Sequence, residues 1–389
     1  MIKRTLSEKL IQLSQKFPVL AVIGPRQSGK TTLVKAVFYN KKYLSLEDPE
    51  TREFAISDPK GFLHNIKDGA ILDEVQRVPE LFSYIHADVD NDKRDGKFIL
   101  TGSNNFLLNE KISQSLAGRV AIFNLLPFSI IELKNTEFEF KDYEEYVFRG
   151  LYPGIYDKNI NPIDWYPNYI QTYIERDVRM IKNISDLNSF QKFIKLCAGR
   201  IGQVLNLSSI ANDCGINHNT AKAWFSILQT SFIVFFIEPY HKNFTKRLIK
   251  MPKLYFYDTG LACSLLGLKT VEYLDTHYLK GNLFENFVMS EFIKFFYNNG
   301  ETPPCYCWRE KTGKEIDLII DIYENTKIIE IKSGKTITKD YFKELEYFKK
   351  ISNSISDNLY VIYGGMENQI RSYGNVLSWK NIDKIFYSL

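Results

Sequence analysis

Short apolar runs alternate with amphipathic stretches over the first third of the chain. The run at 18–23 has the length and character of a buried central strand, and further strands are expected at 69–74, 97–103 and 120–126. Residues 31–38 instead follow a helical period, which places Leu33, Val34 and Val37 on one side. Strands that alternate with helices predict an α/β domain in this part of the chain.

The segment between the first strand and the first helix carries a phosphate-binding pattern. Residues 24–32 fit G-x-x-x-x-G-K-[ST] without a gap. A strand, a glycine-bounded loop and a helix start together aim backbone N–H groups at phosphates. We expect Lys30 to reach the β- and γ-phosphates and the Thr31 hydroxyl to contact Mg²⁺. The predicted nucleotide-binding residues of this loop are Gly24, Gln27, Ser28, Gly29, Lys30, Thr31 and Thr32.

Polar side chains at the ends of two further strands supply the second half of an NTPase site. Asp73 and Glu74 follow an apolar run, and we expect Asp73 to hold Mg²⁺ and Glu74 to orient the attacking water. The strand at 97–103 ends in a polar run, where Ser103 or Asn104 contacts the γ-phosphate or the water. The alternative for Ser103 and Asn104 is a strand-capping turn.

A single arginine, Arg119, precedes the strand at 120–126. Three roles are open to it: an arginine finger for a neighbouring subunit, a sensor within its own subunit, or a surface cation. The first role requires a homo-oligomer, and the first two make Arg119 catalytic.

These motifs resemble the AAA+ ATPase module at the front of a widespread prokaryotic family. The resemblance covers residues 1 to about 135 and rests on 24–32, 72–79, 100–103 and 115–119. It implies a P-loop AAA+ domain of three α/β/α layers that uses ATP and Mg²⁺. No guanine-reading Asn-Lys-x-Asp run is present, so the resemblance implies an ATPase rather than a GTPase.

Composition favours a cytoplasmic protein of several domains. The chain has 389 residues, of which 44% are hydrophobic, enough for two or three cores. Its longest apolar run, 232–237, is far too short to span a bilayer, so no membrane contact is expected. The N-terminus reads as an amphipathic helix start rather than a signal peptide. The five cysteines form no C-x-x-C pair, which favours reduced thiols. Because the net charge is only +4, any nucleic-acid affinity has to come from local patches.

One such patch lies in the middle of the chain. Residues 207–228 predict two helices joined by a turn at Gly215, and a strand at 232–237 follows. Five Lys or Arg and no acid lie between Tyr240 and Lys253, which suits a winged-helix hairpin facing phosphates. The predicted DNA-binding residues are Asn219, Lys222, Lys246, Arg247 and Lys250. The alternative is a winged helix that docks protein.

The C-terminal third carries a second catalytic signal. Glu330 and Lys332 lie two residues apart on an otherwise apolar strand, so both project from one face. Asp317 lies on the preceding strand, and Glu285 lies on an apolar helix at 283–296. We expect Glu285, Asp317 and Glu330 to bind a divalent metal, with Lys332 polarising a hydrolytic water. The alternative is an internal Glu330–Lys332 ion pair.

This arrangement resembles the PD-(D/E)xK nuclease superfamily. The matching residues are Asp317, twelve intervening residues and then 330–332, within an α-β-β-β-α-β order over about 275–389. Ile316 replaces the motif proline. The resemblance implies a restriction-endonuclease-like α/β domain that uses Mg²⁺ or Mn²⁺, with Asp317, Glu330 and Lys332 catalytic. The same fold also serves as a binding module without cleavage.

The sequence therefore predicts four parts. They are an AAA+ ATPase domain at 1–135, a helical connector at 136–190, a winged-helix segment at 191–255 and a nuclease-like domain at 256–389. The predicted function is that of an ATP-hydrolysing protein that associates with double-stranded or branched DNA and cleaves it with a metal ion. The alternative is an ATP-controlled switch whose winged helix and tail bind DNA or protein without cutting.

Overall fold

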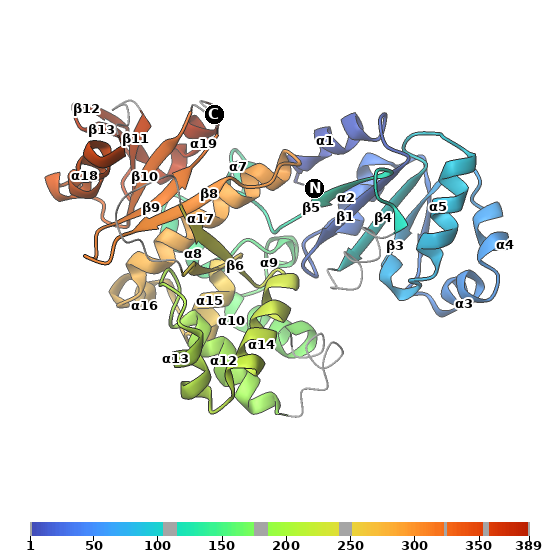
Figure 1. Cartoon of the computed structure of the whole chain (residues 1–389), viewed down its shortest axis with the longest axis horizontal. Helices are drawn as coiled ribbons and strands as arrows, with labels where there is room; N and C mark the ends of the chain where they lie inside the picture. The colour runs from blue at the N-terminus through green and yellow to red at the C-terminus, as the bar shows by residue number, and fades with distance from the viewer. Residues whose placement is uncertain are drawn as a thin grey trace.

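A computed structural model describes residues 2–103, 115–174, 186–240, 251–322, 325–352 and 358–387. Two sheets lie at opposite ends of the molecule, and a group of helices lies below and between them (Figure 1). None of the helices in these ranges is long and apolar enough to cross a membrane.

The N-terminal sheet is parallel and carries helices on both faces. Its strands follow the order β2-β3-β4-β1-β5. They are β1 (Val19–Gly24), β2 (Lys42–Ser45), β3 (Ala70–Asp73), β4 (Phe98–Ser103) and β5 (Val120–Asn124). The helices are α1 (Leu6–Leu13), α2 (Lys30–Val37), α3 (Pro49–Ser57), α4 (Pro59–His64) and α5 (Leu81–Asn91), with the 3-10 turn η1 (Val75–Arg77).

Successive residues of β1 enter two different cores, because strand side chains alternate between faces. Leu20 and Val22 pack with α1 and α2, whereas Val19 and Ala21 join the core that includes α4 and α5. The parallel α/β architecture that the sequence predicts is therefore confirmed, with helices packed on each side of the sheet.

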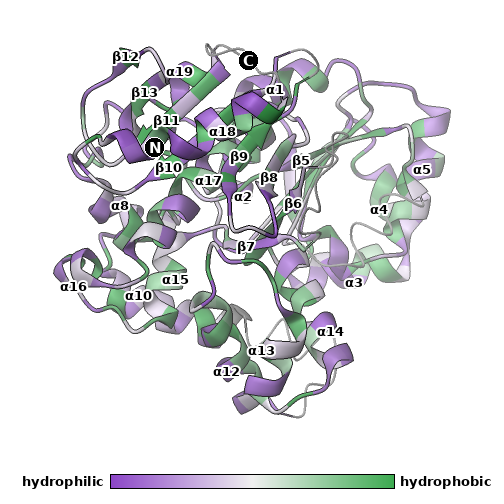
Figure 2. Ribbon diagram, turned by 60° about the vertical axis from the view of Figure 1, so that its left-hand side comes forward, coloured by the Kyte–Doolittle hydropathy of each residue, from purple (hydrophilic) through white to green (hydrophobic). Residues whose placement is uncertain are grey.

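The central part of the chain is helical. Its elements are α7 (Ile130–Leu133), α8 (Tyr143–Arg149), α9 (Pro153–Asp157), α10 (Pro162–Tyr169), the π-helix η2 (Ile170–Ile174), α12 (Leu187–Ala198), α13 (Leu207–Cys214), α14 (His218–Thr230), α15 (Thr259–Leu265) and α16 (Val271–Thr276). In Figure 2, α3 and α16 show much purple, whereas α15, which is almost wholly buried, is mostly green. The helix pair at 207–228 has the predicted form: Gly215 takes a left-handed φ of 72° after α13, and Asn217 caps α14.

A buried carboxylate fastens this central part together. Asp258 accepts hydrogen bonds from Leu151 N at 2.7 Å, from Leu261 N at 2.9 Å and from Tyr166 Oη at 2.6 Å. Gly150 lies against this group with φ +67°, and a Cβ there would lie 1.8 Å from Tyr166 Oη. Only glycine fits at this position, since the chain conformation and the space both exclude a side chain.

The C-terminal sheet has eight strands in the order β12-β13-β11-β10-β9-β8-β6-β7. The strands are β6 (Val234–Pro239), β7 (Lys253–Phe256), β8 (Cys305–Arg309), β9 (Glu315–Ile320), β10 (Lys327–Lys332), β11 (Leu359–Tyr363), β12 (Gln369–Arg371) and β13 (Gly374–Ser378). Around them lie α17 (Lys280–Asn298), η3 (Lys339–Phe342), α18 (Lys343–Ser352), η5 (Trp379–Asn381) and α19 (Asp383–Phe386). The order α17-β8-β9-β10-α18-β11 is the element order that the sequence predicts.

The strands β6 and β7 extend this sheet. β6 pairs in parallel with β8 through Glu238 and Pro239, and β7 pairs antiparallel with β6. A division of the chain at 255/256 would therefore cut through β7. Lys253, the last basic residue of the predicted phosphate-facing hairpin, is 1% exposed. The sheet buries its side chain, so Lys253 does not belong to an exposed basic surface.

The helix α17 joins the two ends of the molecule. It contacts β7 and β10 of the C-terminal sheet as well as β5 and α1 of the N-terminal domain (Figure 1). Near the N-terminal domain, Glu291 Oε2 accepts a hydrogen bond from Ile130 N of α7 at 2.8 Å. The same helix carries Glu285, so one element links the N-terminal domain to the second predicted site.

Candidate active sites

The phosphate-binding loop joins the carboxyl end of β1 to the start of α2. Gly24 approaches the neighbouring strand so closely that a Cβ would lie 2.1 Å from the carbonyl oxygen of Leu125. Gly29 has φ +90° directly before α2. The Lys30 ammonium donates to the loop carbonyls of Gly24 at 3.0 Å and Pro25 at 2.8 Å. The loop therefore curls around its own lysine at a helix N-terminus, which is the geometry that a phosphate group requires.

The remaining predicted loop residues differ in their surroundings. Gln27 has a left-handed φ of 61°, Ser28 is fully buried, and Thr32 lies exposed in the first turn of α2. The Ser28 carbonyl accepts a hydrogen bond from Arg4 Nη1 at 2.8 Å. Arg4 is itself buried and also binds Leu126 O and Glu132. The sequence analysis missed Arg4, because nothing in its local pattern distinguishes it from other basic residues near a chain end.

Asp73 lies at the end of β3 and faces the loop. The Thr31 hydroxyl donates to both of its carboxylate oxygens, at 3.0 and 3.1 Å. Tyr43 Oη donates at 2.8 Å from β2, and Thr101 Oγ1 donates from β4. Burial and the hydrogen bond to Asp73 raise the pKa of Tyr43 to about 12, so Tyr43 stays a donor. The two predicted Mg²⁺ ligands, Thr31 and Asp73, are therefore already in contact.

Glu74 is held in place by its neighbours. It has a left-handed φ of 55°, and its Oε2 accepts hydrogen bonds from Ser103 Oγ at 3.0 Å and from Gln76 Nε2. Burial alone would raise the pKa of Glu74, but the nearby Lys30 charge and these hydrogen bonds outweigh it and hold the pKa below its usual value. Glu74 is thus ionised at neutral pH. Gln76, to which the sequence analysis assigned no role, contacts Glu74, whereas Asn104 lies outside the described residues.

Arg119 lies at the amino ends of the strands, whereas the phosphate loop lies at their carboxyl ends. It directly precedes β5, and its carbonyl accepts from Val19 N at the start of β1, whereas the phosphate loop begins where β1 ends. The six residues of β1 separate these two ends of the strand by roughly 16 Å, at about 3.3 Å per residue. The guanidinium is paired with Asp90, at 2.9 Å between Nη2 and Oδ2. A sensor role within its own subunit is therefore wrong, because Arg119 cannot reach a nucleotide in its own loop.

The second group of predicted residues meets on β9 and β10. The pairing of Ile328 with Ile319 and of Ile329 with Leu318 brings Glu330 and Asp317 opposite each other. Asp317 Oδ2 accepts from Ile331 N at 2.9 Å and lies 3.9 Å from Lys332 Nζ. Lys332 also pairs with Glu330 Oε1. Glu330 is 2% exposed, and its Oε2 has no hydrogen-bond partner among the described residues.

Glu285 joins the same cluster through Lys253, which the sequence analysis placed at the end of the basic run that follows Tyr240. Lys253 Nζ lies 3.1 Å from Glu285 Oε1, 3.6 Å from Asp317 Oδ1 and 3.8 Å from Glu315 Oε2. Tyr255 Oη donates to Glu285 Oε1 at 2.5 Å. Glu285, Asp317, Glu330 and Lys332 thus converge as predicted, but within the described ranges no three acidic, His or Cys side chains form a ready metal cage.

The cluster holds more negative charge than its lysines balance. Burial raises the pKa of Glu285 to about 7, since the repulsion from Asp317 adds to burial and Lys253 only partly offsets both. Burial and Asp317 also raise the pKa of Glu330 well above its ordinary value. A buried carboxylate oxygen without a partner, beside a second carboxylate, fits a divalent cation.

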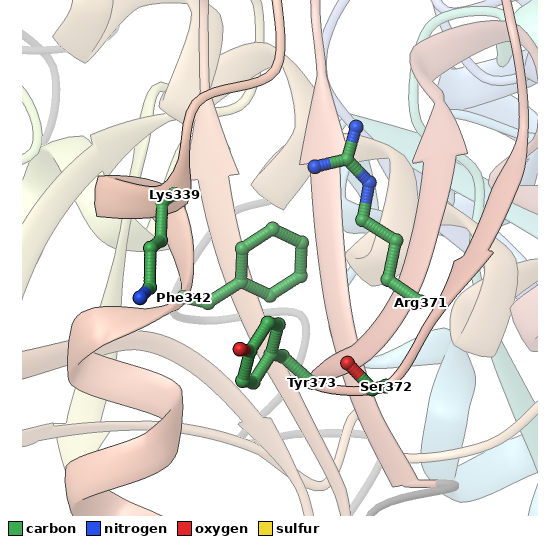
Figure 3. A pocket seen from close by; sticks show the side chains of 5 residues that line it. All are labelled: Lys339, Phe342, Arg371, Ser372 and Tyr373. Carbon is green, nitrogen blue, oxygen red and sulfur yellow. The ribbon is translucent and has the colours of Figure 1, made fainter.

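A pocket of about 360 Å³ lies on the same domain, and none of its residues was predicted. Its lining consists of Lys339, Phe342, Arg371, Ser372 and Tyr373. The rings of Phe342 and Tyr373 lie side by side in its middle, 6.0 Å between centroids, with Arg371 and Lys339 at its edges (Figure 3). Aromatic faces flanked by cations are the groups that contact single-stranded nucleic acid.

The predicted DNA-binding residues are only partly described. Asn219 and Lys222 are exposed on α14, as a recognition helix requires. Lys246, Arg247 and Lys250 lie outside the described residues.

Three family profiles match successive parts of the chain. Residues 16–134 match an AAA domain, 140–272 match the domain of unknown function DUF8612, and 280–382 match the domain of unknown function DUF4143. The carboxylate cluster spans the second and third matches, because Lys253 comes from one and Glu285, Asp317 and Glu330 come from the other.

Related proteins cover most of the chain. The uncharacterized protein Rv2008c of Mycobacterium tuberculosis is 26% identical over 336 residues, which cover 86% of this chain and 74% of that protein. An uncharacterized protein of Haemophilus influenzae is 22% identical over 324 residues, with 75% and 78% covered.

Solved structures with a similar arrangement are more distant. The Walker-type ATPase PABY2304 of Pyrococcus abyssi has a TM-score of 0.47 and 17% identity, and the match covers 68% of this chain and 96% of that one. AMPPCP-bound DnaA of Aquifex aeolicus has a TM-score of 0.31 and 14% identity, with 58% and 85% covered. The profile match and the loop geometry together make residues 16–134 an AAA-type P-loop ATPase domain.

Proposed function

We propose that this protein hydrolyses ATP at the P-loop and that its C-terminal carboxylate cluster cleaves DNA with the help of a divalent metal ion. The ATPase half rests on one observation above all. Thr31, Asp73 and Glu74 meet at the carboxyl ends of the parallel strands. Thr31 is hydrogen-bonded to Asp73, and Ser103 donates a hydrogen bond to Glu74. These contacts support the proposal, because they hold the three groups together before any ligand binds.

Each residue of the ATPase site has a distinct role. Lys30 and the loop N–H groups bind the β- and γ-phosphates, and the ionised Glu74 orients the attacking water. Ser103 and Gln76 position Glu74 through its Oε2. Thr31 and Asp73 would hold Mg²⁺, which when bound neutralises charge on the phosphate oxygens.

The nuclease half rests on the unpartnered Oε2 of Glu330. Among the described residues this buried carboxylate oxygen has no hydrogen bond, which is costly, and a divalent cation shared with Asp317 would remove that cost. Lys332 projects from the same face and stays cationic, because Asp317 and Glu330 outweigh the effect of burial and raise its pKa. Asp317 and Glu330 are the proposed metal ligands, and Lys332 is placed to polarise a water near them.

DNA as the substrate is supported by the surface. The exposed Asn219 and Lys222 on α14 and the aromatic–cationic pocket around Phe342 offer contacts to a nucleic-acid strand. The alternative is a tail that binds DNA or protein without cutting it. This alternative is supported by Lys253 and Lys332, which already contact the carboxylates.

One assay separates these two functions. Labelled linear, forked and four-way DNA is incubated with the protein and Mg²⁺ or Mn²⁺, with and without ATP. Cleavage by the parent protein and none by Asp317→Ala, with unchanged ATP hydrolysis in the absence of DNA, supports the nuclease. Binding of DNA without cleavage of any substrate under either metal would make the tail a binding module.

A further inference from the structure

Lys253 is buried in the middle of the carboxylate cluster. Its side chain is 2% exposed, and its ammonium contacts Glu285 and Asp317 from one side. The backbone of Lys253 is held on both sides, because Lys253 pairs with Ile237 of β6 and forms a β-bridge with Val204. Lys253 is therefore a permanent component of the site.

The charges of the cluster set a limit on further cations. Glu285, Asp317 and Glu330 face Lys253 and Lys332. When all five groups are ionised, three carboxylates and two ammonium groups leave one net negative charge. Glu315 adds nothing to this sum, because Arg309 Nη1 lies 3.5 Å from its Oε2. One divalent cation together with one substrate phosphate would bring the site to neutrality. A second cation would leave two buried positive charges without partners, which is costly.

The two ends of the cluster also differ in their free acceptor atoms. At the Glu285 end, Oε1 already accepts from Tyr255 Oη and contacts Lys253. At the Glu330 end, Oε2 is buried without a partner among the described residues. Asp317 lies between the ends, with Oδ1 toward Lys253 and Oδ2 toward Lys332. The buried acceptor atom without a partner among the described residues is therefore at the Glu330 end.

We propose that Lys253 takes the place of a second divalent cation, so that the cluster holds a single ion between Asp317 and Glu330. Glu285 then holds Lys253 and is not a metal ligand, which revises the three-carboxylate set that the sequence predicts. This inference rests on the proposed metal-dependent function and specifies how that site is loaded.

The test counts bound Mn²⁺ by electron paramagnetic resonance in nucleotide-free protein. Every protein carries Asp73→Asn, which removes the other divalent site. The parent is expected to bind one ion per chain, and Asp317→Asn is expected to weaken binding by about 100-fold or more. Lys253→Met is expected to bind two ions, because the Glu285 end becomes free.

A double variant guards against a misfolded single one. Lys253→Met with Glu285→Gln removes both members of the buried pair and leaves the net charge of the cluster unchanged. It is expected to bind one ion with an affinity within about tenfold of the parent. Circular dichroism and a thermal melt check that each variant is folded.

The outcomes distinguish this inference from the function it rests on. Two ions in the parent, one ion in folded Lys253→Met, or none in the double variant would overturn the role of Lys253 and leave metal-dependent cleavage standing. No ion in any variant would overturn both.

Discussion

The Thr31 hydroxyl donates to both carboxylate oxygens of Asp73, at 3.0 and 3.1 Å, across 42 residues of sequence. This contact joins the first turn of α2, which follows the phosphate loop, to the end of β3. Because Tyr43 and Thr101 also donate to Asp73, its carboxylate is held from two neighbouring strands and one helix. The ATPase site is thus organised by the fold itself, and binding of a nucleotide does not have to assemble it.

Arg119 is expected to act only across an interface between subunits. Because Arg119 lies at the start of β5, it cannot reach a nucleotide in its own phosphate loop. An arginine-finger role therefore requires a neighbouring subunit. If the protein assembles with ATP, Arg119→Ala should lower turnover by about 10³-fold. Mixing Arg119→Ala with Glu74→Gln subunits should restore part of it, by pairing an intact arginine with an intact glutamate.

The matched control for Arg119 is Arg94→Ala, which removes another exposed arginine of the same domain that pairs with an aspartate. Its turnover should equal that of the parent. Full turnover by Arg119→Ala, or no rescue at any mixing ratio in an assembly, would leave Arg119 as a surface cation.

The basic residues Lys246, Arg247 and Lys250 are expected to contact the DNA backbone. Neutralising all three should weaken binding to every sequence and lower the slope of log affinity against log salt by about 3, since fewer counterions are released. Replacing the exposed lysines Lys16, Lys60 and Lys93 of the N-terminal domain is the control. Equal salt slopes for the two triple variants would assign the segment to protein docking.

Gly150→Ala is expected to destabilise the central part of the fold. The new Cβ would lie 1.8 Å from Tyr166 Oη and 2.4 Å from Asp258 Oδ1, so the hydrogen bonds that hold Asp258 must shift. Overpacking and the left-handed backbone together should lower the free energy of unfolding by about 3 kcal/mol or more.

Gly267→Ala separates the two contributions. Gly267 has φ +77°, and a Cβ added there would meet no described atom within 4 Å, so this variant should lose only about 1 kcal/mol. Chemical denaturation measures both variants, and equal losses would show that the space around Gly150 is not limiting.

Local patterns predicted much of both sites because the relevant residues are close in sequence. The phosphate loop is a single run, and the spacing of Glu330 and Lys332 fixes their common face whatever the sheet around them. Asp317 and Glu285 followed from assigning one strand and one helix. The helix pair that ends in Gly215 and begins again at Asn217 was predicted from turn and cap chemistry in the same way.

Long-range pairing could not be predicted in the same way. Lys253 belongs to a basic run, and only the joining of β6 to β8 reveals that it lies inside a sheet beside Glu285. Arg4 bonds to the loop through a backbone carbonyl, which leaves no trace in side-chain patterns. The sequence places Arg119 directly before a strand, and only the pairing and direction of β5 show that it lies at the end of the strands opposite the phosphate loop.

The most direct test of the central claim is ATP binding and turnover in two variants of the P-loop site. Lys30→Ala should lose tight ATP binding, since the cation that faces the β- and γ-phosphates is gone. Glu74→Gln should bind ATP as the parent does, yet release phosphate at least about 100-fold more slowly, because only the water-orienting carboxylate is altered. Equal turnover by Glu74→Gln and the parent, measured as phosphate release at saturating ATP, would contradict the account.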